Sequence, residues 1–469
     1  MGKTCPQSQN IIPNLYTVRD FFLLLLSKQS TMEQLLHYVW KHKMFPLEEL
    51  RTSDGETVEV IDAGLHNNNS GPDFLNAKIK IDGTLWAGSV EIHCKSRDWY
   101  THGHDRDAAY DNTVLHVASL VDTEVKTSSG RTVPQLQLDV PPRIAQNFAE
   151  LIATDHYPPC YKVIPDIEKM KVHSWMNVLQ TERLEQKTAD IMHRVERCDG
   201  SWEDACFVTL ARNCGFGING DAFEEWAFNL GLHSIAHHRD DIFQIEACFM
   251  GQAGLLETDA VPERYRDAAL REGYFTRLRN EYLYLAHKFG LKPIDVSRWR
   301  FLRLRPQNFP HIRISQLANL YFNRRAGLSA IIDCDTTEQL RSMFATCVTP
   351  YWETHYVFGG TSHKTEKHLS TQSANLLIIN TAVPMLFAYG RHKQDERLCD
   401  KALRLLEQVA AENNHIVRMW RACGLEVANA GDSQALIQLK KEYCDRKDCL
   451  RCRFGYEYLK NRYAPTTAG

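Results

Sequence analysis

One stretch, residues 90–95, decides the fold: Val90-Glu91-Ile92-His93-Cys94-Lys95. Successive side chains of a β-strand point to opposite faces, so Glu91, His93 and Lys95 share one face. Ile92 and Cys94 point the other way and are expected to enter the core. An alternating strand in which every polar residue is ionisable is unusual for a strand that is merely half-buried. The stretch therefore predicts a strand whose polar face carries chemistry.

The sequence around this stretch predicts a β-rich module. Apolar residues recur at helical spacing from Glu33, and Pro46 ends that run. Strands are expected over residues 57–62, 74–81, 84–86, 89–95, 113–120 and 133–138. Asp82-Gly83 is a strong hairpin turn signal. The expected order is a helix, three strands, an irregular insert rich in His and Asp, and two further strands.

Beyond Pro141-Pro142 the pattern becomes helical. Helical periodicity covers residues 143–155, 168–198, 202–213, 220–231, 239–255, 272–289, 312–323, 336–346, 370–389, 393–412, 415–423 and 432–443. The fold class is therefore α+β: a mixed α/β N-terminal module with a mostly antiparallel sheet, followed by a large all-α region. The expected parts are an extension (1–31), the module (32–142), the helical region (143–440) and a cysteine-bearing tail (441–469).

Composition limits the classes of function. The chain has 469 residues, a net charge of −3 and 14 cysteines without framework spacing. The charge gives no general attraction to nucleic acid, so such binding must rest on local patches. Scattered cysteines indicate a reducing compartment, and we expect a cytoplasmic protein. The apolar residues 21–26 are too short for a bilayer, which needs about 20, so no membrane association is expected. Because the first helix begins directly after it, Met32 is favoured as the natural start.

Two carboxylates are expected to meet at the module's central strands. Asp73 opens the second strand and Glu91 lies on the third, a separation that one hairpin can close. Paired carboxylates can bind Mg²⁺ or Mn²⁺ and leave room for water and phosphate. His93 or Lys95 can then orient the attacking water or stabilise the developing charge. Further candidates near this strand are Glu33, His102, His104, Asp105, Asp107 and His116.

The arrangement of these acids resembles the restriction-endonuclease-like superfamily. Its core is a helix, three antiparallel strands, a helix and a strand, with an Asp opening the second strand and acid-x-Lys on the third. Pro72-Asp73 and Glu91-x-His93 match that layout within about residues 33–140. His93 departs from it, since the superfamily usually has Lys there and Lys95 comes two residues later. The resemblance implies a metal-dependent nuclease with Asp73 and Glu91 as metal ligands.

Other interpretations of the same residues stay open. Glu91 and Lys95 fit cross-strand ion pairs of a surface strand, and Asp73 fits a turn after proline. His116, in an apolar strand, fits a satisfied core residue. A third possibility is a histidine metal site in a cupin-type barrel that uses His93, His102 and His104, although a helix preceding the strands argues against that fold.

Almost the whole chain from Met32 also resembles a bacterial family catalogued as domain of unknown function 2851. Residues 37–50, 69–80, 90–99, 303–314 and 432–455 carry this resemblance. The family has no established activity. The resemblance implies a bacterial cytoplasmic setting and leaves the chemistry open.

Three cysteines near the C-terminus have metal-ligand spacing. Cys444, Cys449 and Cys452 form C-x₄-C-x₂-C among basic residues, a pattern typical of zinc and iron–sulfur sites. A fourth ligand is needed, and Cys160 is the preferred donor, with Cys423 second. The set resembles an iron–sulfur staple of some nucleases of the superfamily above. The alternative is three reduced structural cysteines.

A basic stretch over residues 299–313 interleaves arginines with aromatic residues. Arg300, Arg303, Arg305 and Arg313 suit contact with nucleic acid. Alternatively, Arg300 and Arg303 form the solvated face of a helix that buries Phe301.

Two functions from different classes follow. The first is a metal-dependent, nuclease-like enzyme that acts on phosphodiester bonds. The second is a non-catalytic scaffold or binding protein with a structural metal at the C-terminal cysteines. Their discrimination depends on whether Asp73 and Glu91 meet, since ions of the Mg²⁺ type need oxygens at about 2.0–2.1 Å.

Overall fold

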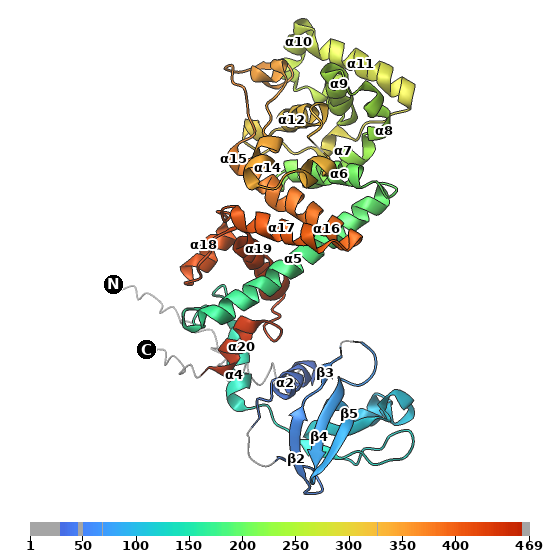
Figure 1. The fold of residues 1–469 in the computed structure, drawn as a ribbon, viewed down its shortest axis with the longest axis vertical. Helices are drawn as coiled ribbons and strands as arrows, with labels where there is room; N and C mark the ends of the chain where they lie inside the picture. The colour runs from blue at the N-terminus through green and yellow to red at the C-terminus, as the bar shows by residue number, and fades with distance from the viewer. Residues whose placement is uncertain (1–28, 46–49, 68, 326, 462–469) are drawn as a thin grey trace, which may run out of the picture. The chain divides into compact units, whose positions relative to one another are not determined.

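The computed structural model describes residues 29–45, 50–67, 69–325 and 327–461. The apolar residues 21–26 lie outside this range. The chain divides into two compact units: unit 1 comprises residues 1–167 and 441–469, and unit 2 comprises residues 168–440. Unit 1 holds a mixed sheet and unit 2 is helical, so the α+β class is confirmed (Figure 1).

The sheet of unit 1 has seven described strands. They are β1 (Leu50–Arg51), β2 (Thr57–Asp62), β3 (Leu65–His66), β4 (Phe74–Ile81), β5 (Thr84–Lys95), β6 (Thr113–Leu120) and β7 (Gln135–Gln137). Their order is β1-β2-β4-β5-β6-β7, with β3 beside β4. The main strands agree with those expected, except that residues 84–86 and 89–95 form one continuous strand, β5.

The first strands form an antiparallel meander and the later ones run parallel. Asp82 (φ 46°) and Gly83 (φ 83°) make the tight β4–β5 turn, as expected for a two-residue hairpin with two positive φ angles. β6 runs parallel to β5, and β7 parallel to β6. A parallel pair requires a crossover connection. That crossover contains α3 (Asp98–Thr101), η1 (His104–Arg106) and η2 (Ala108–Tyr110).

The two edges of the sheet approach each other. Thr52, directly after β1, forms an antiparallel bridge with Leu136 on β7. The amide of Ser53 donates to the carbonyl of Gln135 at 2.8 Å. The sheet is therefore nearly closed into a barrel, with few unpaired edge groups.

Helix α2 (Gln29–Lys41) packs on this sheet and includes Met32. Leu36, Val39 and Trp40 have no exposed surface, and the Trp40 indole donates to the carbonyl of Ala63 at 3.0 Å. This packing fixes the rotation of α2. Residues four apart on a helix are neighbours, so Glu33 and His37 are presented together.

Unit 1 also contains a helix pair built from distant parts of the chain. Helix α4 (Pro142–Ala153) packs against α20 (Arg453–Lys460). The buried Asn147 amide lies between them and donates to the carbonyls of Tyr458 at 3.3 Å and Leu459 at 3.2 Å. Through this pair the C-terminal segment becomes part of the same unit as the sheet.

Unit 2 is formed by helices around one large apolar core. They are α5 (Lys169–Arg197), α6 (Trp202–Cys214), α7 (Gly220–Asn229), α8 (Leu232–Ile235), α9 (Ile242–Gln252), α10 (Glu263–Glu272), α11 (Tyr274–Phe289), α12 (Pro310–Phe322), α13 (Leu328–Ile332), α14 (Thr337–Phe344), α15 (Thr371–Leu377), α16 (Val383–Lys393), α17 (Glu396–Gln408), α18 (His415–Ala422) and α19 (Ala430–Gln438). Periodicity missed α8, α10 and α13.

One helical stretch of unit 2, Thr371–Lys393, is long and apolar enough to cross a membrane by length and composition alone. It comprises α15, a π-helical turn (Ile378–Ala382) and α16. Within the structure, 72% of its apolar window is buried, which identifies it as a core helix of this unit. Periodicity predicted a helix over residues 370–389. A helix that is apolar on most sides is typical of a buried position.

Candidate metal centre

Asp73 and Glu91 meet in unit 1 and hold each other through the backbone. The amide of Asp73 donates to Glu91 Oε2 at 3.0 Å, and the amide of Ile92 donates to Asp73 Oδ2 at 2.9 Å. The β4–β5 hairpin pairs Phe74 with Val90, which places the two acids side by side. The expectation that one hairpin joins them is therefore correct.

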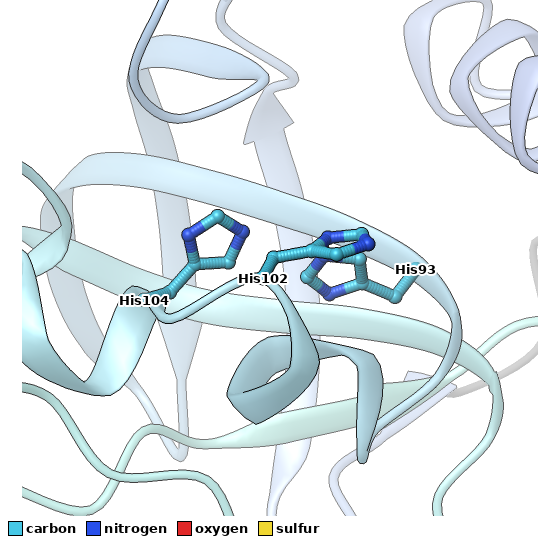
Figure 2. Close-up of side chains that lie close together, drawn as sticks. All are labelled: His93, His102 and His104. Atoms are coloured by element: carbon cyan, nitrogen blue, oxygen red, sulfur yellow. The ribbon is translucent and has the colours of Figure 1, made fainter.

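Three histidines, His93, His102 and His104, lie close together (Figure 2), and two of them contact Glu91. The possible ligand atoms of His93, His102 and His104 all lie within 4.8 Å of one another. His93 Nε2 is 3.1 Å from His102 Nδ1, and Glu91 Oε1 is 3.2 Å from His104 Nε2 and 3.6 Å from His93 Nε2. We call Asp73, Glu91, His93, His102 and His104 the His–acid cluster.

The crossover after β5 supplies two of these histidines. His102 follows helix α3, His104 begins η1, and Gly103 between them has φ 79°, a left-handed conformation that glycine adopts without strain. The ring of Tyr110 stacks on His104 with 3.8 Å between the ring centroids. Asp107 caps η2 by accepting from the amide of Ala109, so its role is structural. The insert is therefore an ordered support for the histidines.

A chain of hydrogen bonds fixes the tautomer of His93. The Gln135 amide nitrogen donates to the carbonyl of Thr123 at 2.8 Å, which turns Oε1 toward His116 Nδ1 at 3.1 Å. His116 must donate through Nδ1, so its Nε2 accepts from His93 Nδ1 at 2.9 Å. The lone pair of His93 Nε2 then faces the His–acid cluster, as a metal ligand requires.

Burial makes the cluster electrostatically unusual. Burial, followed by the charge of Asp73, raises the pKa of Glu91 to about 9. Burial and the neighbouring His116 lower the pKa of His93 to about 2. Burial also lowers the pKa of His116 to about 4, so both imidazoles stay neutral. The imidazoles are neutral and the carboxyl group has few cations around it. A bound positive ion would therefore stabilise this set of donors.

Helix α2 contributes two residues at the edge of the cluster. His37 Nε2 lies 3.3 Å from Asp73 Oδ2. Burial acts to lower the pKa of His37, but the interaction with Asp73 outweighs it and the pKa is raised. Burial raises the pKa of Glu33, which also senses the charges of His37 and Asp73. Sequence reasoning named Glu33 but missed His37, although the spacing of the two on one helix was a usable signal.

The other residues predicted from the sequence are not part of the His–acid cluster. Lys95 lies at the end of β5 with an exposed side chain that makes no ion pair with any described residue. His116 is a fully buried, hydrogen-bonded core residue, which agrees with the simpler interpretation of it. Cys160, Cys444, Cys449 and Cys452 all belong to unit 1, whereas Cys423 belongs to unit 2.

The first half of the basic stretch, residues 299–305, is not helical, whereas Arg313 lies on α12. Residues 299–305 connect η6 (Val296–Arg298) to η7 (Pro306–Asn308), which corrects the alternative that Arg300 and Arg303 lie on a helix face. Both side chains are exposed, as is Arg305. Arg313 is only 5% exposed, binds the Asn308 and Gln316 side chains at 2.6 and 2.8 Å, and packs over the Phe216 ring. Its burial corrects its inclusion among the nucleic-acid contacts.

Unit 1 is thus a nearly closed mixed sheet that carries the buried Glu91 carboxyl group and three converging imidazoles. Comparison with known sequences gives the family. The chain belongs to the family described as "Protein of unknown function (DUF2851)", whose profile matches residues 33–415. No curated protein and no solved structure matches the chain. Nothing in these comparisons links unit 1 to the restriction-endonuclease-like superfamily.

Proposed function

We propose that this protein is a metal-dependent hydrolase of phosphodiester bonds in nucleic acid, and that the His–acid cluster is its active site. The observation that carries the proposal is the convergence of these side chains: Glu91 Oε1 lies 3.2 Å from His104 Nε2 and 3.6 Å from His93 Nε2, and His93 Nε2 lies 3.1 Å from His102 Nδ1. Ligands at about 2.0–2.1 Å from a tetrahedral ion lie roughly 3.4 Å apart. The spacing therefore matches the donors of a single ion.

The types of donor atom limit which metal ion can bind. Mg²⁺ prefers oxygen ligands, whereas imidazole nitrogens suit first-row transition ions. Glu91 is the oxygen donor, and His93, His102 and His104 are the nitrogen donors. We therefore revise the expected Mg²⁺ or Mn²⁺ to a transition ion such as Mn²⁺ or Zn²⁺. Such an ion, when bound, supplies a Lewis acid and lowers the pKa of water.

The protein's own groups around the cluster have matching roles. Asp73 holds the Glu91 carboxylate through its amide, and its own carboxylate lies at the more accessible rim, with a 23% exposed side chain. His37, beside Asp73, keeps a proton close to the cluster because its pKa is raised. It is therefore suited to protonate the leaving oxygen of a cleaved phosphodiester.

A pocket of about 450 Å³ lies next to His37. It is lined by Gln34, His37, Tyr38, Lys41, His66, Asp448, Leu450 and Arg451. Lys41 and Arg451 are exposed cations, and Asp448 pairs with Arg451 at 3.2 Å. Cations beside a reacting centre attract phosphate groups, which favours a polyanionic substrate although the whole chain has a charge of −3. We propose nucleic acid as the substrate and the cytoplasm as the compartment.

The test uses the purified full chain with single-stranded DNA, double-stranded DNA and RNA. Each is incubated with Mn²⁺, Zn²⁺, Mg²⁺ or a chelator. We expect cleavage with Mn²⁺ or Zn²⁺ that falls at least about 100-fold in Glu91→Gln, since that variant loses the charged donor. Glu59→Gln is the matched control because Glu59 lies on β2, is 69% exposed and, among the residues that the structure describes, forms an ion pair only with Lys80.

Two outcomes would overturn the hydrolase proposal. One is equal cleavage by the wild type and Glu91→Gln, which would indicate a contaminating nuclease. The other is metal binding at the cluster without cleavage of any substrate. The latter result would favour the competing function, a scaffold or binding protein whose metal is structural.

A further inference from the structure

Four cysteines outside the His–acid cluster gather in unit 1. Cys160 follows α4, while Cys444, Cys449 and Cys452 lie between the π-helical turn (Leu439–Cys444) and α20. The two segments that carry these cysteines lie side by side, since Tyr157 bonds Asp445 and Lys447 bonds the carbonyl of Ile152. Cys160 and Cys452 are 7% and 6% exposed. None of the described cysteines forms a disulfide.

The two segments that carry these cysteines are fixed to each other by polar contacts as well as by α4 and α20. The Lys447 ammonium donates to the carbonyl of Ile152 at 3.1 Å. The Tyr157 hydroxyl donates to Asp445 Oδ1 at 2.9 Å. These contacts flank Cys160 and Cys444, so the approach of the thiols does not depend on a single flexible loop.

The turn that carries Cys449 and Cys452 is shaped for close approach. The amide of Cys452 donates to the carbonyl of Cys449 at 3.3 Å, and α20 begins at the next residue. Gly455 packs against this turn so tightly that a Cβ there would lie 2.1 Å from the Cys449 carbonyl oxygen. Only glycine permits this approach, which holds both thiols near the start of α20.

A metal ion would give these four cysteines a common role, because thiolates ligate the ion and neutralise its charge.

We propose that Cys160, Cys444, Cys449 and Cys452 together ligate one thiolate-bound metal centre, a zinc ion or an iron–sulfur cluster. Both centres take four cysteine ligands, and C-x₂-C supplies two of them from one turn. The centre joins residues 441–461 to the segment after α4. It thereby also fixes Asp448 and Arg451, which line the pocket beside His37. The inference is independent of the hydrolase proposal.

The test measures metal in the full chain after anaerobic purification, by elemental analysis and visible absorption. His102→Ala is the background, since it removes a donor of the other candidate centre. We expect either about one zinc, or iron with acid-labile sulfide and visible charge-transfer absorption. Cys160→Ser should lose most of this metal. Cys423→Ser should retain it, because Cys423 lies in unit 2.

Two results would overturn the proposal: absence of both metals from the His102→Ala background, or full metal content in Cys160→Ser. If Cys160→Ser does not fold, alkylation of the thiols in the chain that retains Cys160 tests the proposal instead. We then expect the four cysteines to be protected relative to Cys423 until a chelator is added. Equal labelling with and without the chelator would refute the metal centre.

Discussion

The amide of Asp73 donates to Glu91 Oε2 at 3.0 Å, and the amide next to Glu91, that of Ile92, donates back to Asp73 Oδ2 at 2.9 Å. This reciprocal pair fixes the buried Glu91 and the partly exposed Asp73 without using an arginine or lysine. Glu91 Oε1 stays directed at His104 and His93. The carboxylate is thus held by the backbone on one side and offered to histidines on the other.

The hydrogen-bond chain behind His93 gives the first prediction. Gln135→Leu removes the acceptor of His116 Nδ1, so the tautomer of His93 is no longer fixed. We expect Mn²⁺ affinity to fall by about 10–100-fold, as is usual for supporting partners of metal ligands. Gln137→Leu, on the exposed face of the same strand, should leave the affinity unchanged. Equal affinities for both variants would refute the role assigned to Gln135.

The close approach of α20 to the Cys449 turn gives the second prediction. Gly455→Ala places a Cβ against the Cys449 carbonyl, and we expect stability to fall by about 1–3 kcal/mol together with loss of cysteine-bound metal. Gly220→Ala in α7 meets only ordinary contacts at 3.5 Å and should be neutral or slightly stabilising. Calorimetry and metal analysis check both. A Gly455→Ala chain as stable and metal-loaded as the wild type would contradict this packing.

A buried histidine of unit 2 gives a pH prediction. Burial lowers the pKa of His311 to about 3, and its Nδ1 has no hydrogen-bond partner. The unfolded chain takes up a proton near pH 6.5 while the folded chain resists it. Stability is therefore fully present above pH 6.5 and is lost as the pH falls toward 3.

The measurement compares denaturant unfolding at pH 7 and pH 5. The His311 term should cost the wild type about 2 kcal/mol between these values, at about 1.4 kcal/mol per unit of pKa shift. His311→Phe keeps the aromatic contacts with Phe301, Trp352 and Phe358 and removes that term. A variant with the same pH dependence as the wild type would show that His311 is protonated in the folded state.

The basic pocket beside His37 gives a kinetic prediction. Lys41→Gln and Arg451→Gln remove cations that face the proposed substrate and not the bond that is cleaved. We expect KM for a nucleic acid to rise several-fold, with a smaller salt dependence and little change in kcat. Lys78→Gln, exposed on β4, should behave as the wild type. A change confined to kcat would place these cations at the reaction and contradict a binding role.

Local patterns were sufficient for much of unit 1. Alternation in residues 90–95 predicted the central strand, and Asp82-Gly83 predicted the hairpin that joins Asp73 to Glu91. Both patterns depend only on residues that are close together in the sequence. The bridge between Thr52 and Leu136 joins positions 84 apart and leaves no local pattern, so the closure of the sheet was not predicted.

The candidate centre was predictable in its parts and not in its assembly. The residue types of Glu91, His93 and the histidines of the insert were visible, but three imidazoles around one carboxylate depend on the path of the crossover. The support from Gln135 was invisible, since a glutamine on a short strand carries no motif. For the four cysteines, the sequence spacing indicated three of them as possible ligands. Cys160 follows two prolines and belongs to no such motif.

The central claim is that Glu91 and three histidines bind one transition ion, and Mn²⁺ titration of the full chain tests it most directly. Mn²⁺ is the suitable probe because it favours oxygen and nitrogen over thiolate, so the cysteines do not contribute. His102→Ala removes an exposed donor at little risk to the fold, and His173→Ala, exposed on α5, is the control. We predict about one ion per wild-type chain, an affinity at least about tenfold weaker in His102→Ala, and no change in His173→Ala. Absence of binding to the wild type, or equal affinities in all three chains, would contradict the account.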